Sequence, residues 1–259
     1  MVCLHPILVK IWNDDHTDFY CRNVPCGKCY GCLINKQEDW VNRMLQEVKG
    51  SPSSYFITLT YEDDKVPCNR YGLTLKKKDL QDFMKRLRKH YGKVLRFFAC
   101  GEYGSRTIRP HYHACIFLSD FISLEAFDEV VHKAWTLGWA STSPISQSRM
   151  AYCAKYIVKG AKYPEHSQKP FVLMSRRPGI GAIYLDDNAV HEFHMNHPFM
   201  VKDGHRTRLP RYYRDKIGLI SDPSHDMSEN EFYWSEHRIE RTEQFEKKMS
   251  KSKTLHETL

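Results

Sequence analysis

The chain has 259 residues, of which 41% are hydrophobic and 27% charged, and it carries a formal net charge of +8. This composition is typical of a folded globular protein and excludes an intrinsically disordered chain. No apolar run is long enough to span a bilayer, and residues 1–12 lack the charged and then apolar pattern of a signal peptide. We therefore expect the protein to stay in the compartment where it is made, without a membrane.

The N-terminal segment is rich in cysteine. Nine cysteines without a secretion signal favour metal ligation over a disulfide framework. Cys26, Cys29 and Cys32 have a Cys-x-x-Cys-x-x-Cys spacing, and a tetrahedral zinc needs a fourth ligand, which Cys3 or Cys21 would supply. We expect a structural zinc that holds a loop-rich N-terminus. Buried free thiols and an iron–sulfur cluster are the alternatives.

Two helices and a strand follow. Apolar residues at helical spacing predict a helix over residues 33–49 and an amphipathic helix over residues 75–91, which Gly92 ends. Between them, residues 55–61 are all β-branched, aromatic or Leu, which predicts a buried strand.

Positive charge is concentrated on and around the second of these helices. The basic residues of this segment are Lys76, Lys77, Lys78, Lys85, Arg86, Arg88, Lys89, Lys93 and Arg96. Such a cluster favours a polyanionic partner, because each neutralised phosphate releases counterions. A solvated helix face is the alternative for any single residue.

Residues 97–104 and 111–118 have the pattern of two strands around a polar turn, a β-hairpin. Alternate side chains of a strand share a face, so His111 and His113 point the same way. In a paired hairpin Glu102 lies beside them, which gives two nitrogens and a carboxylate for a divalent metal. For a lone His-x-His pair, half-exposed histidines of an ordinary hairpin are the simpler interpretation.

A third helix begins after its N-cap, Ser123, and ends near Gly138, and residues 139–146 form a short strand. The predicted order is helix, strand, helix, hairpin, helix, strand. It indicates an α+β fold with helices stacked on one sheet.

Residues 147–159 form the next predicted helix, and its polar side carries Tyr152, Lys155, Tyr156 and Lys159. Tyrosines of a core helix normally join the apolar side. A solvated face explains their position, because tyrosine and lysine both reach water easily. An active site also explains it. A phenol is a poor nucleophile at its ordinary pKa of about 10, and a nearby lysine and a metal-polarised phosphate would assist its attack.

Several segments together resemble a known family. They are Phe-x-x-Gly-Glu-Tyr-Gly at 98–104, Arg-Pro-His-Tyr-His at 109–113, Tyr-x-x-Lys-Tyr-x-x-Lys at 152–159, and the segments 24–29, 57–61, 83–87 and 177–181. This set resembles the HUH endonucleases. Within them it is similar to the rolling-circle replication initiators of single-stranded DNA phages, the gokushovirus-type Microviridae. The resemblance covers residues 24–185.

The resemblance implies an HUH (RRM-like) fold, a central antiparallel sheet of about five strands flanked by helices. The histidines would lie on a middle strand with the tyrosine helix alongside. It implies three parts: an N-terminal Cys-rich, zinc-like segment and helix at 1–50, the endonuclease domain at 51–185, and an extension with a peripheral helix and flexible tail at 186–259.

The resemblance also implies a site and partners. Glu102, His111 and His113 would bind Mg²⁺ or Mn²⁺, which polarises the scissile phosphate. The expected partners, in the host cell cytoplasm, are single-stranded or supercoiled viral origin DNA and the host replication helicase and polymerase. The residues expected to contact DNA are Lys85, Arg86, Arg88, Arg109, Arg176 and Arg177; an ordinary exposed loop is the alternative for the last two.

The implied reaction is a nick with a covalent intermediate. Tyr152 or Tyr156 would attack phosphorus and leave a 5′-phosphotyrosine link and a free 3′-hydroxyl, with Lys155 and Lys159 in support. The link keeps the energy of the ester, so religation needs no ATP. Two competing interpretations are a non-enzymatic, zinc-bearing nucleic-acid-binding protein and a metallohydrolase that activates water without a covalent step.

Overall fold

The computed structural model describes residues 3–13, 15–104, 106–158, 163–197, 199–202, 204–218, 239–240, 242–244 and 247, without the side chains of 156–158 and 205. The chain forms two compact units, residues 37–220 and residues 1–36 with 221–259. The expected division at residues 50 and 185 stays a prediction. Among the described residues, no helix is both long and apolar enough to cross a bilayer.

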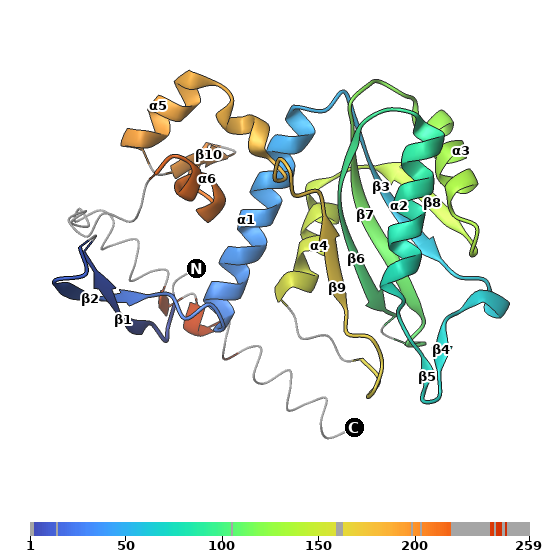
Figure 1. The fold of residues 1–259 in the computed structure, drawn as a ribbon, viewed down its shortest axis with the longest axis horizontal. Coiled ribbons are helices and arrows are strands. Elements are labelled where there is room, and N and C mark those ends of the chain that lie inside the picture. Colours follow the sequence, from blue (N-terminus) through green and yellow to red (C-terminus); the bar gives the residue numbers. More distant parts are fainter. Residues whose placement is uncertain are drawn as a thin grey trace. The chain divides into compact units, whose positions relative to one another are not determined.

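Residues 37–220 are built on a five-stranded sheet with strand order β8-β3-β7-β6-β9 (Figure 1). All neighbouring strands pair antiparallel. The strands are β3 (Ser53–Thr60), β6 (Leu95–Tyr103), β7 (Pro110–Leu118), β8 (Ala140–Pro144) and β9 (Phe171–Met174). The predicted α+β fold with a central antiparallel sheet is confirmed, and the central strand is β7, which carries both histidines.

Helices cover both faces of this sheet (Figure 1). On one face, α2 (Lys77–Tyr91) and α3 (Leu124–Ala134) bury apolar side chains such as Phe83 and Val131 against Ile57 and Leu59 of β3. The other face packs against α4 (Gln147–Val158) and, from Gln37 onward, α1 (Tyr30–Lys49). This second core contains Val41, Met44, Phe98, Phe117, Met150 and Cys153. Because side chains alternate along a strand, Glu102 and the histidines belong to the α1 and α4 face.

The predicted hairpin is formed by β6 and β7, in which Glu102 is paired with His111 across the two strands. The connecting loop is closed by hydrogen bonds from Gly104 N to Arg109 O and from Ile108 N to Gly104 O, of 2.9 and 3.0 Å. Gly101 faces Phe171 of β9, and a Cβ at this glycine would lie 2.9 Å from the Phe171 ring. A glycine at this position therefore lets β9 pair closely with β6.

The segment 177–181, one of the family-like motifs, is held by α1. Glu47 accepts a hydrogen bond of 2.5 Å from Gly181 N and also binds the side chain of Arg96. Arg43, one turn earlier, donates to Ile180 O over 2.9 Å. Glu47 is only 5% exposed, so this buried charge network fixes the segment against the helix.

The ends of several elements differ from the predictions. The helix predicted from residue 33 begins at Tyr30, and the helix predicted to reach Gly138 ends at Ala134. Ser123 caps that helix as expected, accepting from Ala126 N, and Gly92 caps α2 in the left-handed conformation.

Sequence patterns did not predict a further group of short elements. These are β1 (Ile7–Trp12), β2 (Phe19–Val24), β4 (Cys68–Asn69), β5 (Gly72–Leu73), β9, α5 (Asn188–Asn196), β10 (Phe199–Lys202), β11 (His205–Arg208), α6 (Arg211–Lys216) and two 3₁₀ turns at Asp63–Lys65 and Ala182–Leu185. Of the expected C-terminal peripheral helix, residues 239–240, 242–244 and 247 are helical, and the rest lies outside the described residues, as does the expected flexible tail.

Candidate active site

Glu102 of β6 and two histidines of β7 form a compact group of possible metal ligands. The Nε2 atoms of His111 and His113 each lie 3.0 Å from Glu102 Oε1. The three potential ligand atoms all lie within 4.8 Å of one another. Glu102 is 2% exposed and His113 is 9% exposed, so the group is largely removed from water.

The remaining ring nitrogens of the two histidines are also held. His111 Nδ1 donates to Arg109 O over 3.1 Å, since a carbonyl oxygen can only accept. His113 Nδ1 lies 3.0 Å from the hydroxyl of Thr58 on β3, its cross-strand neighbour. Both rings therefore present Nε2 to Glu102, the arrangement found where a histidine ligates a metal and its other nitrogen is fixed by a second group.

These contacts shift the acidity of the site. Burial raises the pKa of Glu102, but hydrogen bonds from His111, His113 and Tyr152 outweigh it and lower the pKa to about 2. Burial lowers the pKa of His111, and the hydrogen bond to Glu102 more than reverses this, so the net shift is upward. Without a cation, protons on the surrounding groups thus balance the Glu102 carboxylate.

Tyr152 reaches the same group from α4. Its hydroxyl donates to Glu102 Oε1 over 2.6 Å, and its ring packs edge-on against that of His113, with centroids 5.1 Å apart. Burial, together with Glu102, raises the pKa of Tyr152 above its ordinary value. The side chain is still 38% exposed, which leaves it open to a substrate.

The apolar side of α4 explains this orientation. Met150, Cys153 and Ala154 are buried in the core between α4 and the sheet, as the helical pattern predicted. Gln37 of α1 also donates to Ala151 O of α4 over 2.8 Å. With this side buried, Tyr152 is turned toward the end of the hairpin that carries Glu102.

The other polar residues of the tyrosine helix are only partly described. Lys155 Nζ lies 5.8 Å from the ring centroid of Tyr152. The backbone of Tyr156 belongs to α4, one helical turn after Tyr152, but its side chain lies outside the described residues, as does Lys159 entirely.

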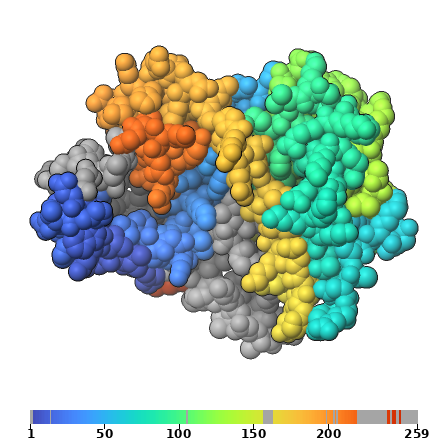
Figure 2. Space-filling model, in the orientation of Figure 1, coloured from blue at the N-terminus to red at the C-terminus, as the bar shows by residue number. Residues whose placement is uncertain are grey.

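The predicted DNA contacts on α2 do not lie beside this group, because α2 covers the opposite face of the sheet. Arg86 Nε donates to Ala134 O over 2.7 Å, so this side chain holds the end of α3. Arg88 lies over the Phe97 ring, and Lys85 is exposed with an ion-pair contact to Asp82. Figure 2 shows α2, in green, as part of the visible surface.

The other three predicted contacts lie in loops. Arg109 is two residues before His111, but its guanidinium binds Asp63 and the carbonyl of Tyr61. Arg176 and Arg177 are exposed in the turn that follows β9. The structure therefore does not gather the six basic residues into one patch.

Thr58 is a site residue that was not predicted. The available signal was that Thr58 and Thr60 share one face of β3, but the pairing of that face with His113 depends on the register between β3 and β7. Sequence alone does not provide this register.

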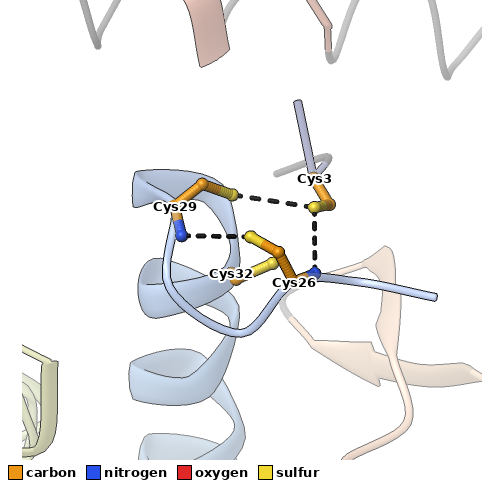
Figure 3. Close-up of side chains that lie close together, drawn as sticks. All are labelled: Cys3, Cys26, Cys29 and Cys32. Carbon is orange, nitrogen blue, oxygen red and sulfur yellow. Dashed lines mark hydrogen bonds between the residues drawn. The ribbon is translucent and has the colours of Figure 1, made fainter. Parts of the chain in front are cut away.

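Four cysteines form a second possible metal group. The sulfur atoms of Cys3, Cys26, Cys29 and Cys32 lie within 4.8 Å of one another (Figure 3). Cys21 lies on β2, is exposed and does not belong to the group, so Cys3 stands in the fourth position.

The thiols of this group differ in acidity. Hydrogen bonds from the backbone N–H groups of Lys28 and Cys29 lower the pKa of Cys26 to about 6. Burial raises the pKa of Cys32 to about 12.

Comparison with known sequences gives a family match. Residues 54–161, which include the hairpin and the tyrosine helix, match the family of replication-associated protein ORF2. The chain is 26% identical over 212 residues to replication-associated protein ORF2 of Spiroplasma virus 4 and 26% identical over 214 residues to replication-associated protein VP4 of Bdellovibrio phage phiMH2K. It is 25% identical over 225 residues to replication-associated protein ORF4 of Chlamydia phage 1.

The first two alignments each cover 74% of this chain and 66% of the relative, and the third covers 78% and 55%. The chain thus spans at most 66% of the length of these relatives. A solved structure, the N-terminal nuclease domain of the Minute virus of mice non-structural protein 1, matches 57% of this chain and 80% of its own at 10% identity. Its TM-score of 0.22 is too low to support an argument. On the sequence matches, the chain is a relative of the replication-associated proteins of phages, which confirms the resemblance seen in its motifs.

Proposed function

We propose that this protein initiates replication by cutting one strand of viral origin DNA and becoming covalently attached to it. The supporting observation is the convergence of His111, His113 and Tyr152 on one oxygen atom of Glu102. This geometry puts a nucleophile of the right chemical class next to a group of metal ligands. The similarity to replication-associated proteins of phages supports the same biological role.

Glu102, His111 and His113 fit a divalent cation. Two nitrogens and an ionised carboxylate converge in a buried position, where protons on the surrounding groups now balance the negative charge. Carboxylate ligands suit Mg²⁺ and Mn²⁺, and imidazole is also accepted by Mn²⁺ and by later transition metals. A bound cation supplies polarisation of the scissile phosphate and stabilises the departing oxygen.

Tyr152 is the nucleophile that the described geometry favours. Its hydroxyl oxygen forms a bond to phosphorus while the bond from phosphorus to the 3′-oxygen breaks, and the electron pair of that bond stays on the 3′-oxygen. In net terms the phenolic proton ends on this oxygen, which gives a 3′-hydroxyl and a 5′-phosphotyrosine. Lys155, near the Tyr152 ring, contributes positive charge as negative charge grows at the phosphate.

We also propose roles that concern the second tyrosine and the host. Tyr156 would cut the regenerated origin in the next round, and reversal of the first step would rejoin the strand without ATP. The free 3′-hydroxyl would serve the host polymerase, with the host helicase, in the cytoplasm of the infected cell. Arg176 and Arg177 are the proposed backbone contacts nearest to β9, because both are exposed.

One assay tests the reaction. Overlapping single strands that cover the viral origin, labelled at the 3′ end, are incubated with the protein and Mn²⁺ and separated on denaturing gels. We expect a labelled protein–DNA adduct that disappears in the Tyr152→Phe, Tyr156→Phe double variant. The single variants show which tyrosine reacts, and Tyr71→Phe, at a 49% exposed position, is the matched control.

The same assay separates the two competing functions. A metallohydrolase would cut the strand without any adduct and would keep its activity in the double tyrosine variant. A non-enzymatic nucleic-acid-binding protein, a possibility that the cysteine group favours, would retard the labelled strand on native gels and leave it uncut. Either result would overturn the proposed function.

A further inference from the structure

We propose that Cys3, Cys26, Cys29 and Cys32 bind one Zn²⁺ ion in a closed structural site that fastens the β1–β2 hairpin to the beginning of α1. This site is distinct from the Glu102 group, and the proposal does not depend on the nicking reaction. It also lies outside the residues that match the replication-protein family, 54–161.

The sulfur atoms already have the spacing that a single tetrahedral ion requires. A zinc–sulfur bond of about 2.3 Å places the ligand sulfurs of a tetrahedral site about 3.8 Å apart. The sulfur atoms of Cys3 and Cys29 are 3.8 Å apart, and all four lie within 4.8 Å of one another. In Figure 3 the four side chains approach one another from the N-terminal strand, the turn and the start of the helix.

The backbone around the group is arranged to support thiolates. Cys26 N donates to the sulfur of Cys3 over 3.2 Å, and Cys29 N donates to the sulfur of Cys26 over 3.3 Å. Hydrogen bonds of this kind orient ligands and stabilise their charged form. The 3.8 Å separation of Cys3 and Cys29 is far longer than a disulfide bond, which fits ligation rather than oxidation.

The ligand set selects zinc over the other candidates. Thiolates are soft ligands, which Zn²⁺ accepts and Mg²⁺ does not. Four protein ligands leave no open position for water or substrate, so the ion is structural. A cluster of several irons carries inorganic sulfide between its metals and spreads its cysteines, whereas the 4.8 Å limit favours a single ion.

The N-terminal hairpin has a physical need for such an ion. β1 and β2 form a two-stranded sheet, which is marginally stable alone in water. Among the described residues, none of the three clusters of buried apolar side chains includes a residue before Trp40. Cys3 and Cys26 flank the hairpin on either side, so one ion bound to both closes it, and the binding free energy of the metal becomes folding free energy.

The experiment measures metal in the purified full-length protein. After dialysis without chelator, mass spectrometry of metals should find one zinc per chain, and a mercurial thiol reagent should release it in a chelator-dye assay. Cys29→Ser should lose the zinc. Cys21→Ser, an exposed cysteine on β2 outside the group, should keep it, and so should His113→Ala at the other metal group.

A second measurement keeps the test valid if Cys29→Ser fails to fold. Wild-type protein exchanged with Co²⁺ should show the intense visible bands of tetrahedral cobalt with thiolate charge transfer. Zinc kept in Cys29→Ser but lost in His113→Ala would overturn the proposal. So would iron in place of zinc, or a wild-type protein that contains no zinc and shows no tetrahedral cobalt spectrum.

Discussion

Tyr152 donates a 2.6 Å hydrogen bond to Glu102 Oε1, the same oxygen atom that lies 3.0 Å from both histidine Nε2 atoms. The contact joins α4 to the β6–β7 hairpin across a separation of 50 residues in the chain. It also gives Glu102 two partners of different kinds, the histidines that would share a cation with it and the phenol that would attack the phosphate. Variants of Glu102 therefore report on both parts of the proposed site.

Glu102→Gln should reduce adduct formation by about 10²-fold or more, because the amide has the size of the carboxylate but no charge for a cation. The measurement is the rate of adduct formation at increasing Mn²⁺ concentration, and we expect partial recovery at the highest concentrations. Glu129→Gln, on the exposed side of α3, is the control and should keep the wild-type rate. An unchanged Mn²⁺ dependence in Glu102→Gln would show that this residue is not a ligand.

The parts of the fold that sequence could predict are those set by local pattern. The alternation along residues 97–104 and 111–118 fixes which side chains share a face, and the hairpin then follows from the short turn. The spacing of Met150, Cys153 and Ala154 likewise predicted the buried side of α4. These patterns need no knowledge of distant residues.

The parts that could not be predicted depend on long-range pairing. The choice of Cys3 over Cys21 depends on how the β1–β2 hairpin returns the chain beside its start. The role of Thr58 depends on the register between β3 and β7. The basic side of α2 was visible in the sequence, but the face of the sheet that α2 covers is a property of the whole topology. Its position on the face opposite Glu102 was therefore not predicted.

Gly101→Ala should destabilise the protein by about 1–3 kcal/mol, because its new methyl group would lie 2.9 Å from the Phe171 ring and push β9 away from β6. Chemical unfolding measures the change. In a double variant with Phe171→Ala, the added methyl group should cost less than it does beside the wild-type ring. Equal costs in both backgrounds would show that the contact with Phe171 does not determine the requirement for glycine.

Stability should fall at alkaline pH through Tyr112. Burial raises the pKa of Tyr112 to about 12, and its hydroxyl lies 2.5 Å from that of Tyr61. The folded pKa exceeds the ordinary value of about 10, so the contribution is complete below pH 10 and is lost as the pH rises toward 12. The loss is about 3 kcal/mol at pH 12, on the basis of 1.4 kcal/mol per pKa unit.

Urea unfolding at pH 8, 10, 11 and 12 measures this dependence. Tyr112→Phe should be less stable at pH 8, because it loses the contact with Tyr61, but its stability should fall less between pH 10 and 12 than that of the wild type. Tyr71→Phe, an exposed tyrosine, should follow the wild-type curve. Parallel curves for Tyr112→Phe and the wild type would contradict the assignment.

Thr58→Val should weaken metal binding and adduct formation by about 10–100-fold, because the hydroxyl that fixes His113 Nδ1 is lost while the shape of the side chain is kept. Thr60→Val is the matched control, since Thr60 lies on the same face of β3 but donates to Trp139 O. The measurements are the Mn²⁺ concentration needed for half-maximal adduct formation and the free energy of unfolding. A positioning role predicts a shifted Mn²⁺ dependence, with rescue by Thr58→Ser, which restores the hydroxyl. A loss of stability without a shift in the Mn²⁺ dependence would instead show that Thr58 serves only the packing of the sheet.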